Sequence, residues 1–209
     1  MIVLGLTGSI GMGKSTAAAL LRRLGIPVHD ADAAVHRLQA NGGAAVAAIA
    51  AAFPGTVREG RVDRQALGRI VFADPAALKR LEAILHPLVR REERKFLAQA
   101  RSRRCRLVAL DIPLLFETHA ERRCDHVMVV SAPRQVQLGR VLRRPGMSRE
   151  RLAGIEARQL PDIVKRARAD TVIDTGLGRR HSLQAIRRAV TLLRRRARRR
   201  GAPELACED

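Results

Sequence analysis

The 209-residue sequence has no Trp, no Tyr, only four Phe and only three Cys. So few aromatic side chains argue against binding of single-stranded nucleic acid, because base-stacking surfaces need aromatic faces. The cysteines, Cys105, Cys124 and Cys207, are widely spaced and form no C-x-x-C pair. This spacing indicates neither a disulfide framework nor a zinc knuckle, and we expect ordinary thiols that are buried or lie in the tail.

Long apolar runs are also missing. No stretch of 18 apolar residues occurs, and the apolar start, residues 1–6, is too short for a signal sequence and lacks a basic flank. We therefore expect a cytoplasmic protein that makes no membrane contact. With 46% apolar residues, the chain can bury the core of one domain, or of one domain with an inserted lobe.

Acidic residues are scarce, so that 40 Lys and Arg against 20 Asp and Glu give a net charge of +20. Such an excess suits either a small anionic substrate or a nucleic acid. Ten arginines lie between Arg179 and Arg200, but an Ala- and Arg-rich composition also arises by drift, which would leave this run as a solvated helix face. Binding of nucleic acid is therefore disfavoured but stays open, and no feature indicates an oligomeric state.

Apolar runs alternate with helical periodicities along most of the chain, which predicts strands and helices in turn. This alternation is typical of an α/β fold with a parallel five-stranded sheet flanked by helices, and with ligands at the carboxyl ends of the strands. We expect strands at residues 2–6, 26–29, 106–110, 126–130 and 171–173, with helices over 133–143, 149–159 and 183–197.

Residues 41–100 differ from this pattern because helical periodicity continues there without a strand between. Helices are expected over 44–52, over 63–72 and along a segment after Pro75. We therefore predict a helical lobe inserted into a single domain. Within that domain, residues 1–40 and 104–200 would form the nucleotide-binding core, residues 140–168 a lid and residues 201–209 a tail.

The clearest motif is Gly-Ser-Ile-Gly-Met-Gly-Lys-Ser at residues 8–15, which matches G-x-x-x-x-G-K-[ST] between a predicted strand and a helix. Glycines let successive N–H groups and the following helix N-terminus face phosphate oxygens. Lys14 would then reach the β and γ phosphates of ATP, and Ser15 would offer its hydroxyl to Mg²⁺. The motif predicts a P-loop NTPase with ATP as co-substrate and Mg²⁺ as cofactor.

Two missing motifs narrow the choice of P-loop family. The single Asn, Asn41, lies in Asn-Gly-Gly, so the chain lacks the N-K-x-D motif of guanine-specific GTPases. It also lacks the L-S-G-G signature of transport ATPases. The small-molecule kinases remain, and their size fits this chain.

Carboxylates follow two of the predicted strands. Asp30 and Asp32 come after the second strand, where a carboxylate can orient an acceptor hydroxyl and take its proton, although Asp is also a common helix N-cap. We expect Asp32 to be catalytic and Asp30 to cap or support. Asp111 ends the third strand, where it would either hold Mg²⁺ through water or serve as a turn residue.

Arginines are frequent on the predicted helices over 133–159. Gln137, Arg140 and Arg144, with Arg143 and Arg158 nearby, predict an arginine-bearing helical lid. Guanidinium groups that close on the transferred phosphoryl group stabilise its charge and exclude water. Taken singly, each of these arginines could equally be a surface charge.

Over roughly residues 1–190, these features together resemble the dephospho-CoA kinase family. The resemblance implies ATP-dependent phosphorylation of the ribose 3′-hydroxyl of dephospho-CoA, the last step of coenzyme A synthesis. It rests on Leu6-Thr7-Gly8 with the loop to Thr16, Asp30-Ala31-Asp32, Asp63-Arg64 with Leu67, Val71-Phe72, Leu81-Glu82, His86-Pro87, Pro113 to Glu117, Gln137 with Arg140 and Arg144, Gln159, and Ala169-Asp170.

Roles follow from this resemblance position by position. It implies that Asp32 is the base at the 3′-hydroxyl, and that Lys14 and Arg140 stabilise the transferred charge, Arg140 as part of a lid and nucleotide clamp. It also implies that the lobe, through His86 and Pro87, shapes the dephospho-CoA site together with Leu114. The ATP-binding residues would be Gly11, Met12, Gly13, Lys14, Ser15 and Thr16.

Three positions depart from the family pattern. Ser9 and Met12 replace a Gly and a small residue, which leaves the backbone donors in place but puts a bulky side chain at Met12 beside the phosphates. Thr175 stands where an Asn is usual, at the adenine end of the ATP site.

Overall fold

The computed structural model describes residues 1–200, so the predicted tail at residues 201–209 and Cys207 lie outside the described residues. The chain forms two compact units. The first comprises Met1–His29 and the chain from Ala100 onward, and the second comprises Asp30–Gln99. None of the helices within residues 1–200 has an apolar stretch long enough to cross a membrane.

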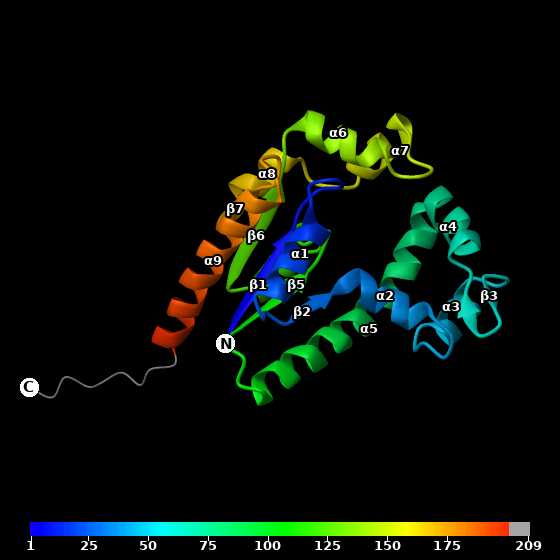
Figure 1. Cartoon of the computed structure of the whole chain (residues 1–209). Coiled ribbons are helices and arrows are strands. Elements are labelled where there is room, and N and C mark those ends of the chain that lie inside the picture. Colours follow the sequence, from blue (N-terminus) through cyan, green and yellow to red (C-terminus); the bar gives the residue numbers. More distant parts are fainter. Residues whose placement is uncertain (201–209) are drawn as a thin grey trace, which may run out of the picture. The chain divides into compact units, whose positions relative to one another are not determined.

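A five-stranded parallel sheet with the strand order β2-β5-β1-β6-β7 forms the centre of the first unit (Figure 1). Its central strand β1 pairs in parallel with β5, where Leu6 lies opposite Asp111, and with β6, where Thr7 lies opposite Val129. The predicted α/β fold with its five strands is therefore confirmed. The strands are β1 (Ile2–Thr7), β2 (Val28–Asp30), β5 (Leu107–Asp111), β6 (His126–Ser131) and β7 (Thr171–Asp174).

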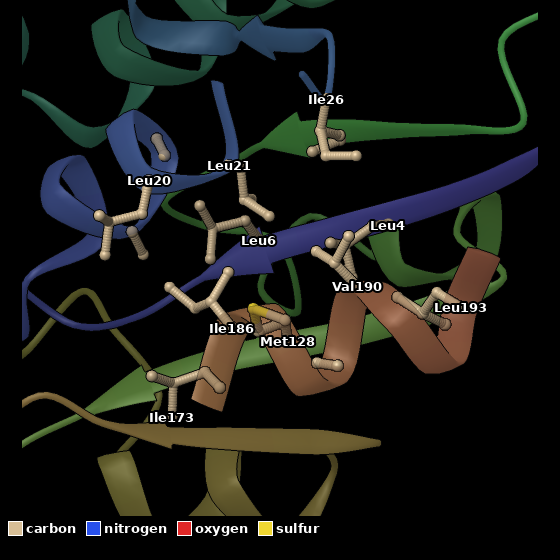
Figure 2. Close-up of a cluster of buried hydrophobic side chains, with 14 of the residues drawn as sticks. Leu4, Leu6, Leu20, Leu21, Ile26, Met128, Ile173, Ile186, Val190 and Leu193 are labelled. Carbon is tan, nitrogen blue, oxygen red and sulfur yellow. The ribbon is translucent and has the colours of Figure 1, made fainter. Parts of the chain in front are cut away.

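Helices α1 (Lys14–Arg23) and α9 (Arg179–Arg200) pack on the sheet and close its main core. Figure 2 shows Leu20 and Leu21 of α1 and Ile186, Val190 and Leu193 of α9 directed toward side chains of the strands. The predicted amphipathic pattern of the last helix thus corresponds to its buried face. The other helices of this unit are η1 (Ala120–Arg123), α6 (Arg134–Leu142), α7 (Arg149–Glu156) and α8 (Asp162–Ala167).

The second unit has a core of its own, formed by apolar side chains of its helices. These helices are α2 (Ala31–Gln39), α3 (Val46–Ala52), α4 (Arg64–Ala73) and most of α5 (Pro75–Ser102). The core includes Leu38, Ile49, Phe53, Leu67, Val71, Leu81 and Leu85.

This unit also contains a small hairpin that was not predicted for this mostly helical segment. Strands β3 (Val57–Arg58) and β4 (Arg61–Val62) pair antiparallel. Glu59 and Gly60 connect them, both with positive φ, at 49° and 72°. Two such residues in succession match a tight two-residue hairpin turn. Strands of two residues are too short to show an alternating pattern in the sequence.

Candidate phosphate-binding site

The glycines of the loop after β1 are required by its geometry. A Cβ on Gly8 would lie 2.4 Å from the Val130 side chain and 2.7 Å from the Val130 carbonyl oxygen. Gly11 and Gly13 have φ values of 78° and 90°, which favour glycine strongly. The loop therefore curls closely against β6 and turns directly into α1.

The N-terminus of α1 is open to an anion. Its N-cap is Gly13, which has no side chain to cap the helix, and the first turn contains no acidic residue. The first N–H groups of a helix lack intrahelical partners, and the helix dipole makes them attractive to negative charge. This end of α1 is therefore built to receive phosphate oxygens.

Lys14 is the first residue of α1, and its side chain is held in an ion pair. Its Nζ lies 2.8 Å from Asp111 Oδ1, and the Asp111 side chain is only 3% exposed. Asp111 is in place because it is opposite Leu6 in the register of β5 and β1. A buried carboxylate without a cation would be costly, so this pair holds Lys14 beside the loop.

The side chain of Met12, one of the departures from the family pattern, is largely withdrawn from solvent. Met12 is buried and packs in the main core, and its sulfur accepts a hydrogen bond of 3.2 Å from the Ala132 backbone N–H. A thioether is flexible and fills irregular gaps, which explains how it fits here.

Thr175 forms hydrogen bonds that connect the loop to Arg140. It is buried, and its hydroxyl donates to the Met12 carbonyl over 2.8 Å and accepts from Arg140 over 2.9 Å. Arg140 also donates to the Thr175 carbonyl over 2.7 Å and lies 3.4 Å from the Gly11 carbonyl. The departure at Thr175 therefore provides a hydroxyl that connects α6 to the loop.

A second set of hydrogen bonds fixes the other side of the loop at Ile10. The Ile10 N–H donates to Gln159 over 3.1 Å, and its carbonyl accepts from the buried Gln137 over 2.9 Å. Gln137 is held in turn by Arg134 and Glu156. The hydrogen bond to Glu156 raises the pKa of Arg134 above its usual value. Sequence reasoning missed Arg134 and Glu156, because surface ion pairs between helices leave no pattern in a single sequence.

A pocket of about 380 Å³ lies beside this part of the loop. Two buried oxygens near it, Ser9 Oγ and Asp162 Oδ1, have no hydrogen-bond partner within residues 1–200. The other carboxylate oxygen of Asp162 accepts from the Ser131 hydroxyl over 2.7 Å. The pocket is therefore polar on the side of α8. Its lining includes Ser9, Met12, Ala132, Gln137, Gln159 and Asp162.

The segment after β5 lies next to the end of β1, because the Thr7 hydroxyl donates to the Pro113 carbonyl over 3.0 Å. Leu115 and Phe116 are fully buried in the fold, whereas Leu114 is only half-buried. Leu114 is therefore the side chain of this Leu-Leu-Phe run that remains accessible to a ligand.

Asp30 and Asp32, in the second unit, have different positions in α2. Asp30 is the N-cap of α2, and its carboxylate accepts from the Ala33 N–H over 2.9 Å. Asp32 lies in the first turn of α2, and its side chain is exposed. Asp30 therefore has the capping role, which was one of the two roles expected for it. His86 and Pro87 are exposed within α5.

Comparison with known proteins adds a family to this site. The family model for dephospho-CoA kinase matches residues 2–178. A dephospho-CoA kinase of Paramagnetospirillum magneticum is 70% identical over 166 residues, which cover 79% of this chain and 78% of the relative. One of Rhodospirillum rubrum is 60% identical over 200 residues, covering 95% and 94%.

Two solved structures are similar to this chain over most of its length. TT1252 from Thermus thermophilus superimposes with a TM-score of 0.81 at 42% identity, covering 91% of this chain and 96% of that one. A dephospho-CoA kinase from Campylobacter jejuni has a TM-score of 0.68 at 26% identity, covering 92% and 97%.

Proposed function

The chain belongs to the dephospho-CoA kinase family, and on that premise we propose that it transfers the γ-phosphoryl group of ATP to the ribose 3′-hydroxyl of dephospho-CoA, giving ADP and coenzyme A. At the level of residues, the main support for this proposal is the glycine loop before α1, where Asp111 holds Lys14 beside the loop. Most of the catalysis then consists of positioning and charge stabilisation.

Lys14 changes partner during the reaction. When ATP binds, its phosphates offer the Lys14 ammonium a stronger partner than Asp111, and backbone N–H groups between Gly11 and Thr16 hold the phosphate oxygens. Negative charge that develops on the leaving β-phosphate is then stabilised by a cation already in place, so little reorganisation is needed.

Ser15 and Asp111 suit a magnesium ion. The Ser15 hydroxyl is exposed in the first turn of α1, and Asp111 supplies a carboxylate at the neighbouring strand end. Mg²⁺ prefers oxygen ligands and binds through one or two protein groups together with phosphates and waters. When bound, the ion would neutralise charge on the β and γ phosphates.

Arg140 places a second positive charge against the loop. We assign it to the nucleotide clamp because its guanidinium is fixed by both oxygens of Thr175 and lies beside Gly11. The segment of residues 140–168 would serve as the lid that excludes water during transfer.

Asp32 would accept the proton of the 3′-hydroxyl as this oxygen attacks the γ-phosphorus. Its exposed carboxylate makes no N-cap hydrogen bond in α2, where Asp30 has that role. The lobe of residues 41–100, through His86 and Pro87, would shape the dephospho-CoA site together with Leu114.

An acceptor panel tests the proposed function. ADP release is measured with ATP, Mg²⁺ and one acceptor at a time: dephospho-CoA, adenosine, a nucleoside monophosphate or pantetheine. We expect turnover only with dephospho-CoA, because the other acceptors each lack part of its nucleotide or its pantetheine arm. Comparable turnover with a nucleoside monophosphate would refute the assignment.

A further inference from the structure

A hollow of about 420 Å³ lies at the amino-terminal ends of the strands, away from the phosphate-binding loop. The proposed function does not use it. It lies where β1 and β5 begin, since the Ile2 N–H donates to the Arg106 carbonyl over 2.8 Å. All of its lining belongs to the first unit. We call it the arginine hollow, and it is lined by Met1, Arg101, Arg104, Cys105, Arg106 and Arg198 together with Ala197.

The chain turns sharply to bring these arginines together. Helix α5 ends at Ser102, and the Arg104 N–H and Cys105 N–H donate back to the carbonyls of Arg101 and Ala100, over 2.9 Å each. Arg104 has a φ of 53°, which is uncommon for a residue with a side chain. The last turn of α9 contributes Arg198 from the other side.

The four guanidinium groups of the hollow have no compensating partner in the part of the chain that the structure describes. Within residues 1–200, none of their side chains forms a hydrogen bond or an ion pair, and no carboxylate lines the hollow. The side chains of these four arginines are exposed, and one hollow brings all four together. Helix C-termini stabilise a nearby cation by only about 0.3–1 kcal/mol, which does not balance four guanidiniums.

We propose that the arginine hollow binds a small polyvalent phosphate compound that carries at least two phosphate groups. Guanidinium groups bind phosphate oxygens in pairs and stay charged at every relevant pH. The volume falls in the range of small-ligand pockets, about 300–1,000 Å³. No aromatic side chain lines it, so phosphate groups, not a base, are recognised.

This site is separate from the phosphate-binding loop. The six residues of β1 lie between them, which at about 3.3 Å per residue amounts to roughly 20 Å. The Debye length at physiological ionic strength is only about 8 Å, so charge in the hollow is screened from Lys14. The proposal therefore stands whether or not the assigned kinase reaction is correct.

Cys105 provides a local reporter, because it lies half-buried in the hollow, whereas Cys124 lies elsewhere in the unit. The full chain is alkylated with iodoacetamide at about 0.15 M KCl, and mass spectrometry follows each cysteine with and without inorganic tripolyphosphate. We expect tripolyphosphate to slow alkylation of Cys105 about five-fold or more, with half-maximal effect below about 1 mM, and to leave Cys124 unchanged.

Matched variants locate the protection. Replacement of Arg104, Arg106 and Arg198 together by Gln should abolish protection of Cys105, whereas Lys14→Ala should keep it. The triple variant should retain the wild-type kcat and KM for ADP release. Unchanged alkylation at about 10 mM tripolyphosphate, or protection that persists in the triple variant, would overturn the proposal.

A parallel experiment with a DNA duplex of about 20 base pairs distinguishes a site for a small ligand from an extended nucleic-acid surface. Specific nucleic-acid interfaces bury about 1,000 Å² or more. Protection by this duplex with none by tripolyphosphate contradicts the proposal and assigns the arginines to a nucleic-acid surface. Protection by tripolyphosphate at similar or lower phosphate concentration supports it.

Discussion

Asp30 and Asp32 stand two residues apart, yet only one of them is bound to the backbone of α2. We predict that Asp32→Asn lowers kcat by roughly 10² to 10⁴, because the amide keeps the shape of the side chain but cannot accept the proton. ATP binding, measured by calorimetry with a non-hydrolysable analogue, should stay within a factor of about two, because the loop is untouched.

Asp30→Asn is the matched control, because Asn caps a helix about as well as Asp. We expect its kcat to stay within a few-fold of the wild-type value. A larger loss in Asp30→Asn than in Asp32→Asn would reverse the two assignments.

Thr175 shows how one hydroxyl can support a whole loop. In Thr175→Val the shape is kept, but the Met12 carbonyl loses its donor and Arg140 loses one acceptor. Leaving buried polar groups unsatisfied costs about 1–3 kcal/mol, which should appear in urea denaturation. We also expect a several-fold rise in KM for ATP. Thr175→Ser keeps the hydroxyl and should behave as wild type, so equal defects in both variants would contradict this role.

His126 gives stability a pH dependence. Its ring is 14% exposed in β6 and lies 2.8 Å from the Thr171 hydroxyl. Burial, partly opposed by Asp170 and aided by Arg196, lowers the pKa of His126 below its usual 6.5. As the pH falls below about 6.5, His126 is protonated in the unfolded chain before it is protonated in the folded protein. The contribution of the neutral His126 to the free energy of unfolding is therefore complete above about pH 6.5 and is lost as the pH falls toward the lowered pKa.

We therefore predict that wild type loses more unfolding free energy between pH 7.5 and about pH 5 than His126→Gln does. Urea denaturation at several pH values measures the two curves. Parallel curves would show that His126 does not carry this dependence.

At the scale of elements, a buried ion pair joins α8 to the segment after β5. Lys165 is fully buried, and its Nζ lies 2.9 Å from Glu117 Oε1, which also accepts from the Leu160 N–H over 2.8 Å. Lys165→Met should cost about 3–5 kcal/mol of unfolding free energy, because it leaves a buried carboxylate without its cation.

The double variant Lys165→Met with Glu117→Gln should recover at least half of this loss, since Gln still accepts from Leu160 and carries no charge. Denaturation of the single and double variants measures the coupling. Additive losses in the double variant would show that the two side chains act independently.

The elements themselves were largely predictable, because long buried strands and amphipathic helices carry clear periodicities. The pattern of β1, β6 and α9 gave their positions to within a few residues. The hairpin at residues 57–62 was missed because its strands are too short to show a period. Lys165 was missed because burial of a lysine depends on a partner that is distant in sequence.

At the scale of the whole molecule, the sequence predicted the sheet and the loop but not which loop contacts would form. The motif at residues 8–15 specifies a phosphate loop, whereas the position of the Met12 side chain depends on its packing in the folded core and on the Ala132 N–H. The role of Thr175 likewise follows from its distance to Met12 and Arg140. Contacts between residues that are distant in the sequence cannot be predicted from local sequence patterns.

The net charge of +20 also acts on the molecule as a whole. Like charges repel more in the compact fold than in the unfolded chain, and salt screens this repulsion. We predict that NaCl, raised from about 20 mM to about 300 mM, increases the unfolding temperature, with about 1 kcal/mol corresponding to about 2–4 °C at this chain length.

The arginine hollow makes this prediction specific. Its four arginines, which have no acceptor among residues 1–200, add to the repulsion, so their replacement by Gln should raise the unfolding temperature at low salt and flatten its dependence on NaCl. A control with four Gln replacements at Arg134, Arg168, Arg140 and Arg194, which all have acceptors, should instead lower the temperature. If the unfolding temperature depends on NaCl equally in wild type and in the hollow variant, the four arginines of the hollow contribute no more to the repulsion than other arginines do.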